Sequence, residues 1–254
     1  MLLIEDLQVE LGDRLILKHI DLEIKPGETH VLFGPNGSGK TSLLMTIMGY
    51  PQYKVVAGKI VFKGIDITHM PINERARLGI GMAYQRPPTI HGLKTRQIVK
   101  LCAHREVDET DLAKRVNFQE FLDRDVNAGF SGGEIKRSEL LQLMAQNPDL
   151  ILLDEPESGV DLENMALVGN TIATLLEKNG KLPTGKPRAQ VRNERQKMGL
   201  IITHAGYILD YVPADKGQVL FEGVMSCSSN PREILTCIAQ VGYEECVQCM
   251  IQKV

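Results

Sequence analysis

Apolar and polar positions alternate along the first part of the chain. The runs at residues 2–11, 16–24 and 29–33 are rich in β-branched or alternating apolar residues, which is the pattern of β-strands. A helix is predicted over residues 41–49, where apolar side chains recur at helical spacing. Residues 57–67 then predict one arm of a β-hairpin.

Helical spacing dominates the middle of the chain, over residues 73–147, with a loop at residues 85–92. Two short, continuously apolar runs follow, at residues 149–153 and 199–203, and such runs are typical of strands buried in a parallel sheet. Strands that alternate with helices predict an α/β fold with a sheet core. The helical stretch of about 87–148 is predicted to form a subdomain inserted into that core.

The overall composition excludes several classes of protein. Of the 254 residues, 43% are hydrophobic and 24% are charged, which is ordinary for a globular domain with a sizeable core. The formal net charge of −3 does not favour binding to nucleic acid. No run approaches the roughly 20 apolar residues of a membrane span, and the N-terminus lacks the basic region of a signal peptide. We therefore expect a single cytoplasmic domain over residues 1–254, without direct membrane insertion.

A glycine-rich segment between a predicted strand and a predicted helix fits the phosphate-binding pattern G-x-x-x-x-G-K-[ST]. Its backbone N–H groups would cradle the phosphates of ATP, with Lys40 on the β and γ oxygens and Thr41 as a ligand of Mg²⁺. The flanking strand and helix disfavour an accidental glycine-rich turn. The residues predicted to bind ATP in this segment are Gly34, Pro35, Asn36, Gly37, Ser38, Gly39, Lys40, Thr41 and Ser42.

Polar side chains follow two of the buried strands. Asp154 and Glu155 come directly after the run at 149–153, and His204 follows the run at 199–203. Because the carboxyl ends of parallel strands face the ligand in an open α/β sheet, Asp154 is predicted to hold Mg²⁺. Glu155 is predicted to polarise the attacking water, the second requirement of phosphoryl transfer. His204 is predicted to contact the γ-phosphate and to hold Glu155 in place.

Gln85 lies at the predicted junction between the sheet core and the helical insertion. Its amide suits a ligand of Mg²⁺ or of the attacking water, and also a sensor of the γ-phosphate. Simpler interpretations stay open for these residues: a surface glutamine for Gln85, a solvated acidic turn for Asp154 and Glu155, and a structural histidine for His204. The phosphate-binding segment favours the catalytic interpretation, because it requires partners of this kind.

A second anion site is predicted at residues 130–134, FSGGE. Ser131 and Glu134 fit the capping box S-x-x-E, and Gly132 and Gly133 bare the backbone N–H groups at the start of a helix. The segment has no lysine of its own, and it belongs to the helical insertion. We therefore expect it to cap the γ-phosphate held by a second copy of the chain, with ATP sandwiched between the two copies.

Taken in order, these motifs resemble those of the ATP-binding-cassette ATPases. GPNGSGKT is similar to their phosphate loop, FSGGE to their signature, LILLDEP to their Walker B strand, SGVD to their D-loop and His204 to their switch histidine. The resemblance spans nearly the whole chain. It implies ATP hydrolysis by a P-loop NTPase fold with a mixed sheet core, an antiparallel β subdomain and the inserted helical subdomain. It also implies that Asp161, in the D-loop, belongs to the nucleotide site.

A finer resemblance is to the SufC group, the soluble cassette ATPases of iron–sulfur cluster assembly. INERARLGIGMAYQRPPTIHGLK, GFSGGEIKRSELLQLM and ITHAGYILDYVPAD carry this resemblance. It implies a SufB-like scaffold that docks at the Gln85 loop, carries the nascent cluster and is rearranged when two copies of the ATPase close on ATP. Two alternatives remain: the nucleotide-binding subunit of a membrane transporter, and a zinc- or cluster-binding module whose cassette is mainly a scaffold.

Two internal features depart from the family pattern. Cassette ATPases often stack adenine on an aromatic residue near the start of the chain, and the nearest equivalent here, around Leu11, has none. The preference for ATP over GTP is therefore left open. Residues 178–199 carry many Lys and Arg side chains, and we expect an exposed excursion there. It is either a solvated loop or a docking arm for an acidic partner.

The third departure is the C-terminal extension expected over about 224–254. It contains the C-x-x-C pair Cys246 and Cys249, with Cys227 and Cys237 before them. A zinc ion or a cluster needs about four such ligands, from one chain or from two. Reduced thiols, some of them packed in a terminal helix, are the favoured interpretation.

Overall fold

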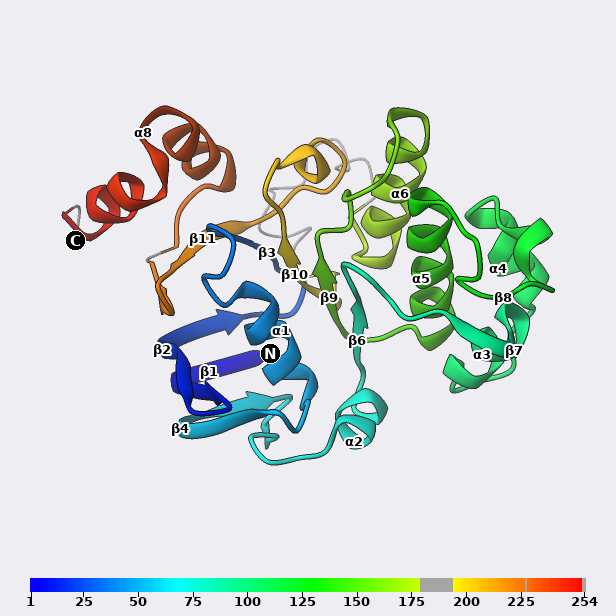
Figure 1. The fold of residues 1–254 in the computed structure, drawn as a ribbon, viewed down its shortest axis with the longest axis horizontal. Coiled ribbons are helices and arrows are strands. Elements are labelled where there is room, and N and C mark those ends of the chain that lie inside the picture. The colour runs from blue at the N-terminus through cyan, green and yellow to red at the C-terminus, as the bar shows by residue number, and fades with distance from the viewer. Residues whose placement is uncertain (179–193, 227, 253–254) are drawn as a thin grey trace.

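The structure is a computed structural model that describes residues 1–178, 194–226 and 228–252 (Figure 1). Within these residues, ten strands form one mixed sheet in the order β5-β4-β1-β2-β12-β11-β3-β10-β9-β6. Its parallel part consists of β3 (Thr29–Phe33), β6 (Ile80–Ala83), β9 (Leu150–Asp154), β10 (Met198–Ile202) and β11 (Lys216–Phe221). Every residue of β3, β9 and β10 is buried, which explains the short apolar runs in β9 and β10.

The other half of the sheet is mainly antiparallel. β1 pairs with β2 on one side and with β4 on the other, and β4 pairs with the short β5. β12 joins this half to the parallel core, because it pairs with both β11 and β2. The bounds of these strands are β1 (Leu2–Leu11), β2 (Arg14–Ile24), β4 (Tyr53–Phe62), β5 (Ile65–Asp66) and β12 (Val224–Met225).

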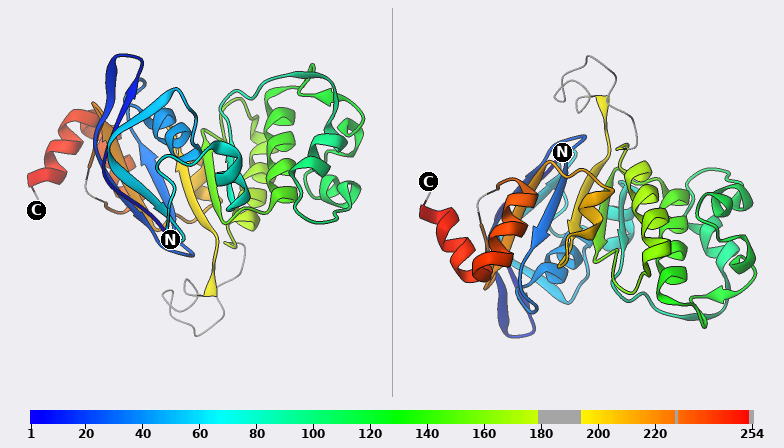
Figure 2. Two further views of the ribbon diagram at one scale, coloured as in Figure 1. Left: turned by 90° about the horizontal axis from the view of Figure 1, so that it is seen from below. Right: turned by 90° about the horizontal axis from the view of Figure 1, so that it is seen from above.

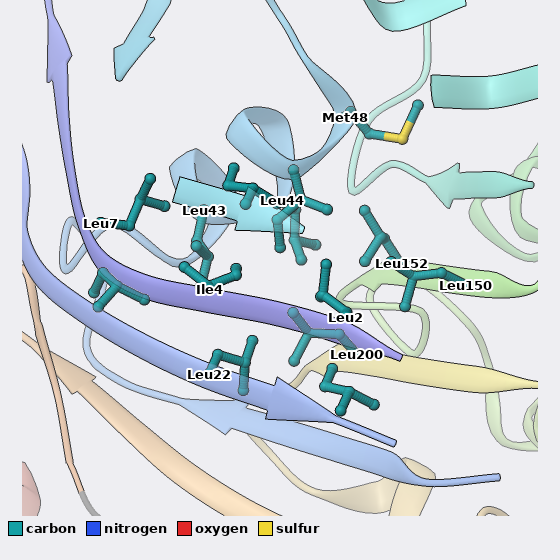
Figure 3. Close-up of a cluster of buried hydrophobic side chains, with 14 of the residues drawn as sticks. Leu2, Ile4, Leu7, Leu22, Leu43, Leu44, Met48, Leu150, Leu152 and Leu200 are labelled. Atoms are coloured by element: carbon teal, nitrogen blue, oxygen red, sulfur yellow. The ribbon is translucent and has the colours of Figure 1, made fainter. Parts of the chain in front are cut away.

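Successive residues of the central strands supply two separate hydrophobic cores. Leu150, Leu152 and Leu200 point to the face covered by α1 and the antiparallel strands, and Figure 3 shows this cluster. Ile151 and Ile201 point to the opposite face, which α5, α6 and the first half of α8 cover. The period-2 alternation of a strand makes this division unavoidable. The covering helices are α1 (Lys40–Met48), α5 (Gly132–Gln146), α6 (Leu162–Leu175) and α8 (Pro231–Gln252).

A helical insertion lies at one end of the molecule, and α8 lies at the other (Figure 2). The insertion has a small core of its own, which includes Val99, Phe118 and Leu141. Its elements besides α5 are the hairpin of β7 (Ile90–Lys94) and β8 (Asp125–Val126), the helices α3 (Thr95–Cys102) and α4 (Glu109–Arg115), and the 3-10 turn η1 (Gln119–Phe121). A second 3-10 turn, η2 (Tyr207–Asp210), follows β10.

The prediction that residues 73–147 are mostly helical, with one loop, misses three strands. The helix α2 (Ile72–Arg77) forms, but it ends before β6, which pairs with β9 in the main sheet. β7 and β8 pair with one another. The sequence of β6, IGMA, is too short to show a period, and its pairing partner lies far along the chain. Gly81 is needed there, because a Cβ would come within 2.6–2.8 Å of side chains of the α5–β9 region.

The prediction of an exposed excursion over residues 178–199 is wrong at both ends of that range. Lys178 is buried, and its Nζ lies 2.6 Å from Asp215 Oδ2. Lys197 Nζ donates to the carbonyl of Pro148, and the next residue begins β10. A lysine can bury its stem when its ammonium group finds acceptors. Residues 179–193, which carry most of the basic side chains, lie outside the described residues.

The C-terminal segment forms α8, with a break in helical geometry at Gly242 (φ 84°, ψ 176°). Asn230 begins the helix, as its side-chain oxygen accepts a hydrogen bond from the N–H of Arg232. Cys246 is fully buried and Cys237 is partly buried. Within the described part of the chain, no group of three or more His, Cys, Asp and Glu side chains is arranged to hold a metal ion. Cys227 and the side chain of Cys249 are outside that part.

Arg75 on α2 ties α1 to the loop before α2, so its loss is expected to destabilise the fold. It is 2% exposed, and burial lowers its pKa to about 10. Its guanidinium donates to four main-chain carbonyls, those of Thr46, Ile47, Thr68 and Met70. Arg75→Met removes all four donors, and we expect the free energy of unfolding to fall by about 3 kcal/mol or more.

Urea titration followed by circular dichroism measures this change. Arg77→Met is the matched control, because Arg77 lies on the same helix with an exposed side chain. Its effect is expected to stay within about 0.5 kcal/mol. Equal midpoints for the two variants would show that Arg75 does not hold these elements together.

The described residues include no helix with the length and apolarity that a membrane crossing requires.

Candidate functional site

A hollow of about 350 Å³ lies where the glycine-rich segment meets the carboxyl ends of β9 and β10. The residues that line it come from β2, the segment before α1, the start of α1, and the loops after β6, β9 and β10. They are Ile16, Asn36, Gly37, Gly39, Lys40, Thr41, Ser42, Gln85, Glu155 and His204. The fold therefore brings the phosphate-loop residues together with all three predicted catalytic residues.

The glycine-rich segment forms a tight loop around the side chain of Lys40. Lys40 Nζ donates to the carbonyls of Gly34 (2.8 Å) and Pro35 (2.9 Å). Gly34 has a φ of 151°, and a Cβ there would lie 2.3 Å from the carbonyl oxygen of Leu220, so only glycine fits. Because α1 begins at Lys40, the free N–H groups of its first turn adjoin the hollow. This is the arrangement that binds phosphate at a helix N-terminus.

Charge is concentrated at the floor of the hollow. Burial lowers the pKa of Lys40, while the nearby carboxylates of Glu155 and Asp154 raise it. Asp154 is 2% exposed, and burial raises its pKa. Its Oδ2 accepts a hydrogen bond from Thr41 Oγ1 at 2.9 Å, whereas its Oδ1 is buried and has no partner. An unpartnered carboxylate oxygen beside a hydroxyl is suited to a hard divalent cation.

Glu155 is held between two other side chains. Gln85 Nε2 donates to Glu155 Oε2 at 2.7 Å, and His204 Nε2 lies 2.7 Å from Glu155 Oε1. The backbone of Glu155 has a φ of 48°, in the left-handed region, which costs a non-glycine residue about 1–3 kcal/mol. Its N–H donates to the carbonyl of Ile202, at the end of β10. The structure thus keeps a strained backbone at the residue predicted to act on water.

The signature segment lies away from this hollow. Ser131 and Glu134 form the predicted capping box at the start of α5, with Ser131 Oγ accepting from the Glu134 N–H and Glu134 Oε2 accepting from the Ser131 N–H. Gly132 packs against the backbone of Gly159, where a Cβ would lie 2.2 Å from the carbonyl oxygen. None of Ser131, Gly132 and Gly133 is among the residues that line the hollow.

Asp161 also lies away from the hollow, and its side chain caps a helix. Its Oδ1 accepts a hydrogen bond from the N–H of Asn164 at 2.8 Å, which caps α6. The lining of the hollow likewise lacks Gly34, Pro35 and Ser38. The single chain therefore presents only part of the predicted set of nucleotide-binding residues on one surface.

Sequence reasoning missed residues that support the site. Ile16 on β2 lines the hollow, whereas Leu11, the position considered for the base, is 39% exposed at the β1–β2 turn. Lys136 on α5 is buried, and its Nζ donates to the carbonyls of Tyr84 (2.5 Å) and Gln85 (3.2 Å). Lys136 and Glu139 are spaced as neighbours on one helix face, which is a signal that sequence analysis had available.

The fold and this hollow together define a nucleotide-binding ATPase with a phosphate loop on an α/β sheet. Residues 17–158 match the family model described as "ABC transporter". The chain belongs to this family of ATP-binding cassettes. The predicted fold class and the prediction of an ATPase are confirmed.

Curated relatives make the position of the chain within the family more specific. It is 36% identical to a "Probable ATP-dependent transporter ycf16" of Cyanidium caldarium, over 88% of this chain and 87% of the relative. It is 35% identical to the "Probable ATP-dependent transporter SufC" of Escherichia coli, over 88% and 90%. It is 34% identical to the "Iron-sulfur cluster assembly protein SufC" of Plasmodium falciparum, over 84% of this chain and 61% of that protein. The resemblance to the SufC group is confirmed.

Solved structures share the fold at lower sequence identity. A dimeric ATP-binding cassette in a post-hydrolysis state, bound to ADP and Pi, superimposes with a TM-score of 0.73 at 20% identity. The match covers 91% of this chain and 99% of that one. At this identity the comparison establishes the architecture alone.

Proposed function

We propose that this protein is a SufC-like ATPase that dimerises on ATP and drives a conformational change in a SufB-like scaffold of iron–sulfur cluster assembly. The relatives from Escherichia coli and Plasmodium falciparum, named SufC, support the assignment. The observation that carries the catalytic part is the Glu155 carboxylate, held by Gln85 and His204 beside the phosphate loop. We place the protein in the cytoplasm, without nucleic acid as a partner.

ATP occupies the hollow with its phosphates on the loop from Gly34 to Ser42. Lys40 turns from the carbonyls of Gly34 and Pro35 to the β and γ oxygens, which are stronger acceptors because they are charged. Mg²⁺ fits the oxygen groups of Thr41, Asp154 and Gln85, since the buried Oδ1 of Asp154 has no other partner. When bound, the ion neutralises charge on the phosphates as the γ-phosphoryl group departs.

Glu155 is the general base that polarises the attacking water. Its two hydrogen-bond partners fix the direction of its carboxylate, so little reorganisation is needed during reaction. His204 also donates to the γ-phosphate, and Gln85 reports the presence of that phosphate to the helical insertion. Base catalysis of this kind contributes about 10²–10⁴-fold to the rate.

A second copy of the chain completes the site. Ser131 and Gly132 are exposed at the start of α5 and Gly133 is buried, and all three lie outside the hollow of their own chain. In the ATP-bound dimer they cap the γ-phosphate of the other copy, and Asp161 lies at the same contact. Closure of the two copies is the movement that reaches the scaffold, which docks beside Gln85.

Replacing Ser131 by arginine is expected to separate nucleotide binding from dimer closure. A single chain should still bind ATP with nearly unchanged affinity, because Ser131 does not line its own hollow. The dimer should not form, since a long cationic side chain would occupy the contact between copies. Calorimetry measures the affinity, and light scattering with ATP measures the dimer. Ser131→Ala, which removes the helix cap at a cost of about 1 kcal/mol but adds no bulk, is the control.

If the arginine variant loses ATP binding as a monomer, the assignment of the signature to the opposite copy is wrong.

Anaerobic co-purification followed by mass spectrometry tests the biological assignment. We expect a scaffold of the SufB type to elute with this chain. We also expect the amount of scaffold retained to depend on the nucleotide that is present. Recovery of integral membrane proteins alone would instead favour the alternative function, the nucleotide-binding subunit of a transporter.

A further inference from the structure

A second hollow, of about 220 Å³, lies between β6 and the helical insertion, and Tyr84, which lines it, directly precedes Gln85 of the nucleotide site. We call it the Glu139 hollow. Its apolar wall includes Pro87, Pro88, Ile90 and Ile98. The elements that border it extend from β6, near the middle of Figure 1, through α5 and α3 to β7 at the right. The two prolines belong to the same loop as Gln85.

The polar groups of the Glu139 hollow include two buried hydrogen-bond acceptors. Glu139 and Asn127 line it, and each residue is 5% exposed. Glu139 Oε2 and Asn127 Oδ1 are buried without a hydrogen-bond partner, and the ammonium of Lys136 is 3.6 Å from the former. A buried acceptor without a donor costs about 1–3 kcal/mol. Two such atoms beside one hollow require an explanation.

Each amide side chain around the hollow uses one of its two N–H donors on a main-chain carbonyl. Asn127 Nδ2 donates to the carbonyl of Pro88, Gln142 Nε2 to that of Ser138 and Gln146 Nε2 to that of Ile80. No Lys, Arg or His is among the described residues that line the hollow. The hollow therefore offers apolar contact and acceptors, and it lacks a cation of its own.

The size of the hollow narrows the choice of occupant. At about 220 Å³ it is smaller than the roughly 300–1,000 Å³ of sites that enclose drug-sized ligands or cofactors. It is suited to one long side chain. A side chain with an apolar stem and a donor-rich cationic end matches both the walls and the acceptors.

We propose that the Glu139 hollow is the socket for an arginine or lysine side chain of the protein partner that docks beside Gln85. This inference rests on the proposed docking of a scaffold at that loop and names the chemistry of its anchor. Burial raises the pKa of Glu139 to about 7, so a cation in the socket would favour the charged carboxylate.

The socket is connected to the catalytic centre by main-chain contacts. Glu139 Oε1 accepts a hydrogen bond from the N–H of Tyr84 at 2.6 Å, and Lys136 Nζ donates to the carbonyls of Tyr84 and Gln85. A partner cation competes with Lys136 for Glu139. It therefore acts on the segment that places the Gln85 amide against Glu155.

Cys102 lines the socket and reports on its charge without any partner present. The intact protein is treated with 2-aminoethyl, methyl or 2-sulfonatoethyl methanethiosulfonate, and modification of each cysteine is followed by peptide mass spectrometry. Cys237, a partly buried thiol on α8 outside the socket, is the internal reference. The preference for the cationic over the anionic reagent at Cys102 should exceed that at Cys237 at least about tenfold.

Glu139→Gln should abolish most of this preference, because glutamine keeps the shape of the protonated carboxyl and removes its charge. Thermal melting checks that the variant is folded. If the variant is unfolded, the comparison of reagents on the unaltered chain still tests the proposal. Equal preferences at the two cysteines, or an undiminished preference in folded Glu139→Gln, would overturn the proposal.

Binding of a SufB-like scaffold gives the second measurement. Glu139→Gln should weaken the complex at least about tenfold, whereas Glu120→Gln, an exposed residue of the same insertion, should not. Equal affinities of the two variants for the scaffold would contradict the proposed socket, whereas the proposed function would still hold. If the unaltered chain does not bind the scaffold at all, the proposed function fails, and the thiol measurements still decide whether the hollow prefers a cation.

Discussion

Replacing Glu155 by glutamine is expected to lower the rate of ATP hydrolysis by about 10²–10⁴-fold while leaving ATP binding intact. Glutamine has nearly the same shape, and its single carbonyl oxygen keeps one of the two contacts that the carboxylate makes with Gln85 and His204. What it lacks is the basicity that draws a proton from water. The contacts to the phosphates remain, so an ATP-bound dimer should accumulate. Phosphate release measures the rate, and size-exclusion chromatography with ATP measures the dimer.

The control for Glu155→Gln is Glu74→Gln, which changes an exposed carboxylate on α2. Its hydrolysis rate should equal that of the unaltered protein. If Glu155→Gln hydrolyses ATP at the parental rate, Glu155 is not the base. If it loses both hydrolysis and ATP binding, Glu155 acts on the ground state.

Lys40→Ala is expected to weaken ATP binding by about 10²–10⁴-fold. Lys40 Nζ has two acceptors in the structure, the carbonyls of Gly34 and Pro35, and the proposed function has it exchange them for two phosphate oxygens. Each hydrogen bond between charged groups contributes about 1.5–3 kcal/mol, and 1.4 kcal/mol is tenfold in affinity. The side chain also braces the loop, so its removal loosens the remaining N–H donors. Calorimetry with ATP and Mg²⁺ measures the loss.

Lys114→Ala, an exposed lysine on α4, controls for the loss of a positive charge and should bind ATP normally. A Lys40→Ala protein that binds ATP as tightly as this control would show that the loop holds the phosphates through its backbone alone.

Sequence analysis recovered the elements whose cause is local. The strand β9 is four consecutive apolar residues followed by an acid, and the helix α5 begins with a capping box, so both follow from neighbouring residues. The strand β6 could not be found this way. Its four residues have no period, and it is a strand only because β9, far away in the chain, offers free main-chain groups to pair with.

The candidate site likewise has a part that local sequence predicts and a part that depends on distant segments. Residues 34–42 could be assigned from spacing, because a phosphate loop needs glycines and a lysine at fixed positions in one continuous segment. The roles suggested for Gln85, Glu155 and His204 depended on their meeting, and they come from three separate loops. The buried pair of Lys136 and Glu139 was missed, since charged side chains are expected at the surface until a packed neighbour is seen.

The sequence by itself determined the family, the phosphate loop, the capped signature helix and the acids at the end of β9. Each of these is encoded in a short run of residues whose backbone geometry and hydrogen bonds are local. Only the tertiary structure decided that Gln85 and His204 contact different oxygens of Glu155. It also decided that buried acceptors without hydrogen-bond partners lie beside the Glu139 hollow. Contacts between distant segments depend on how the sheet and helices pack, and packing buries side chains by position in space rather than by position in the chain.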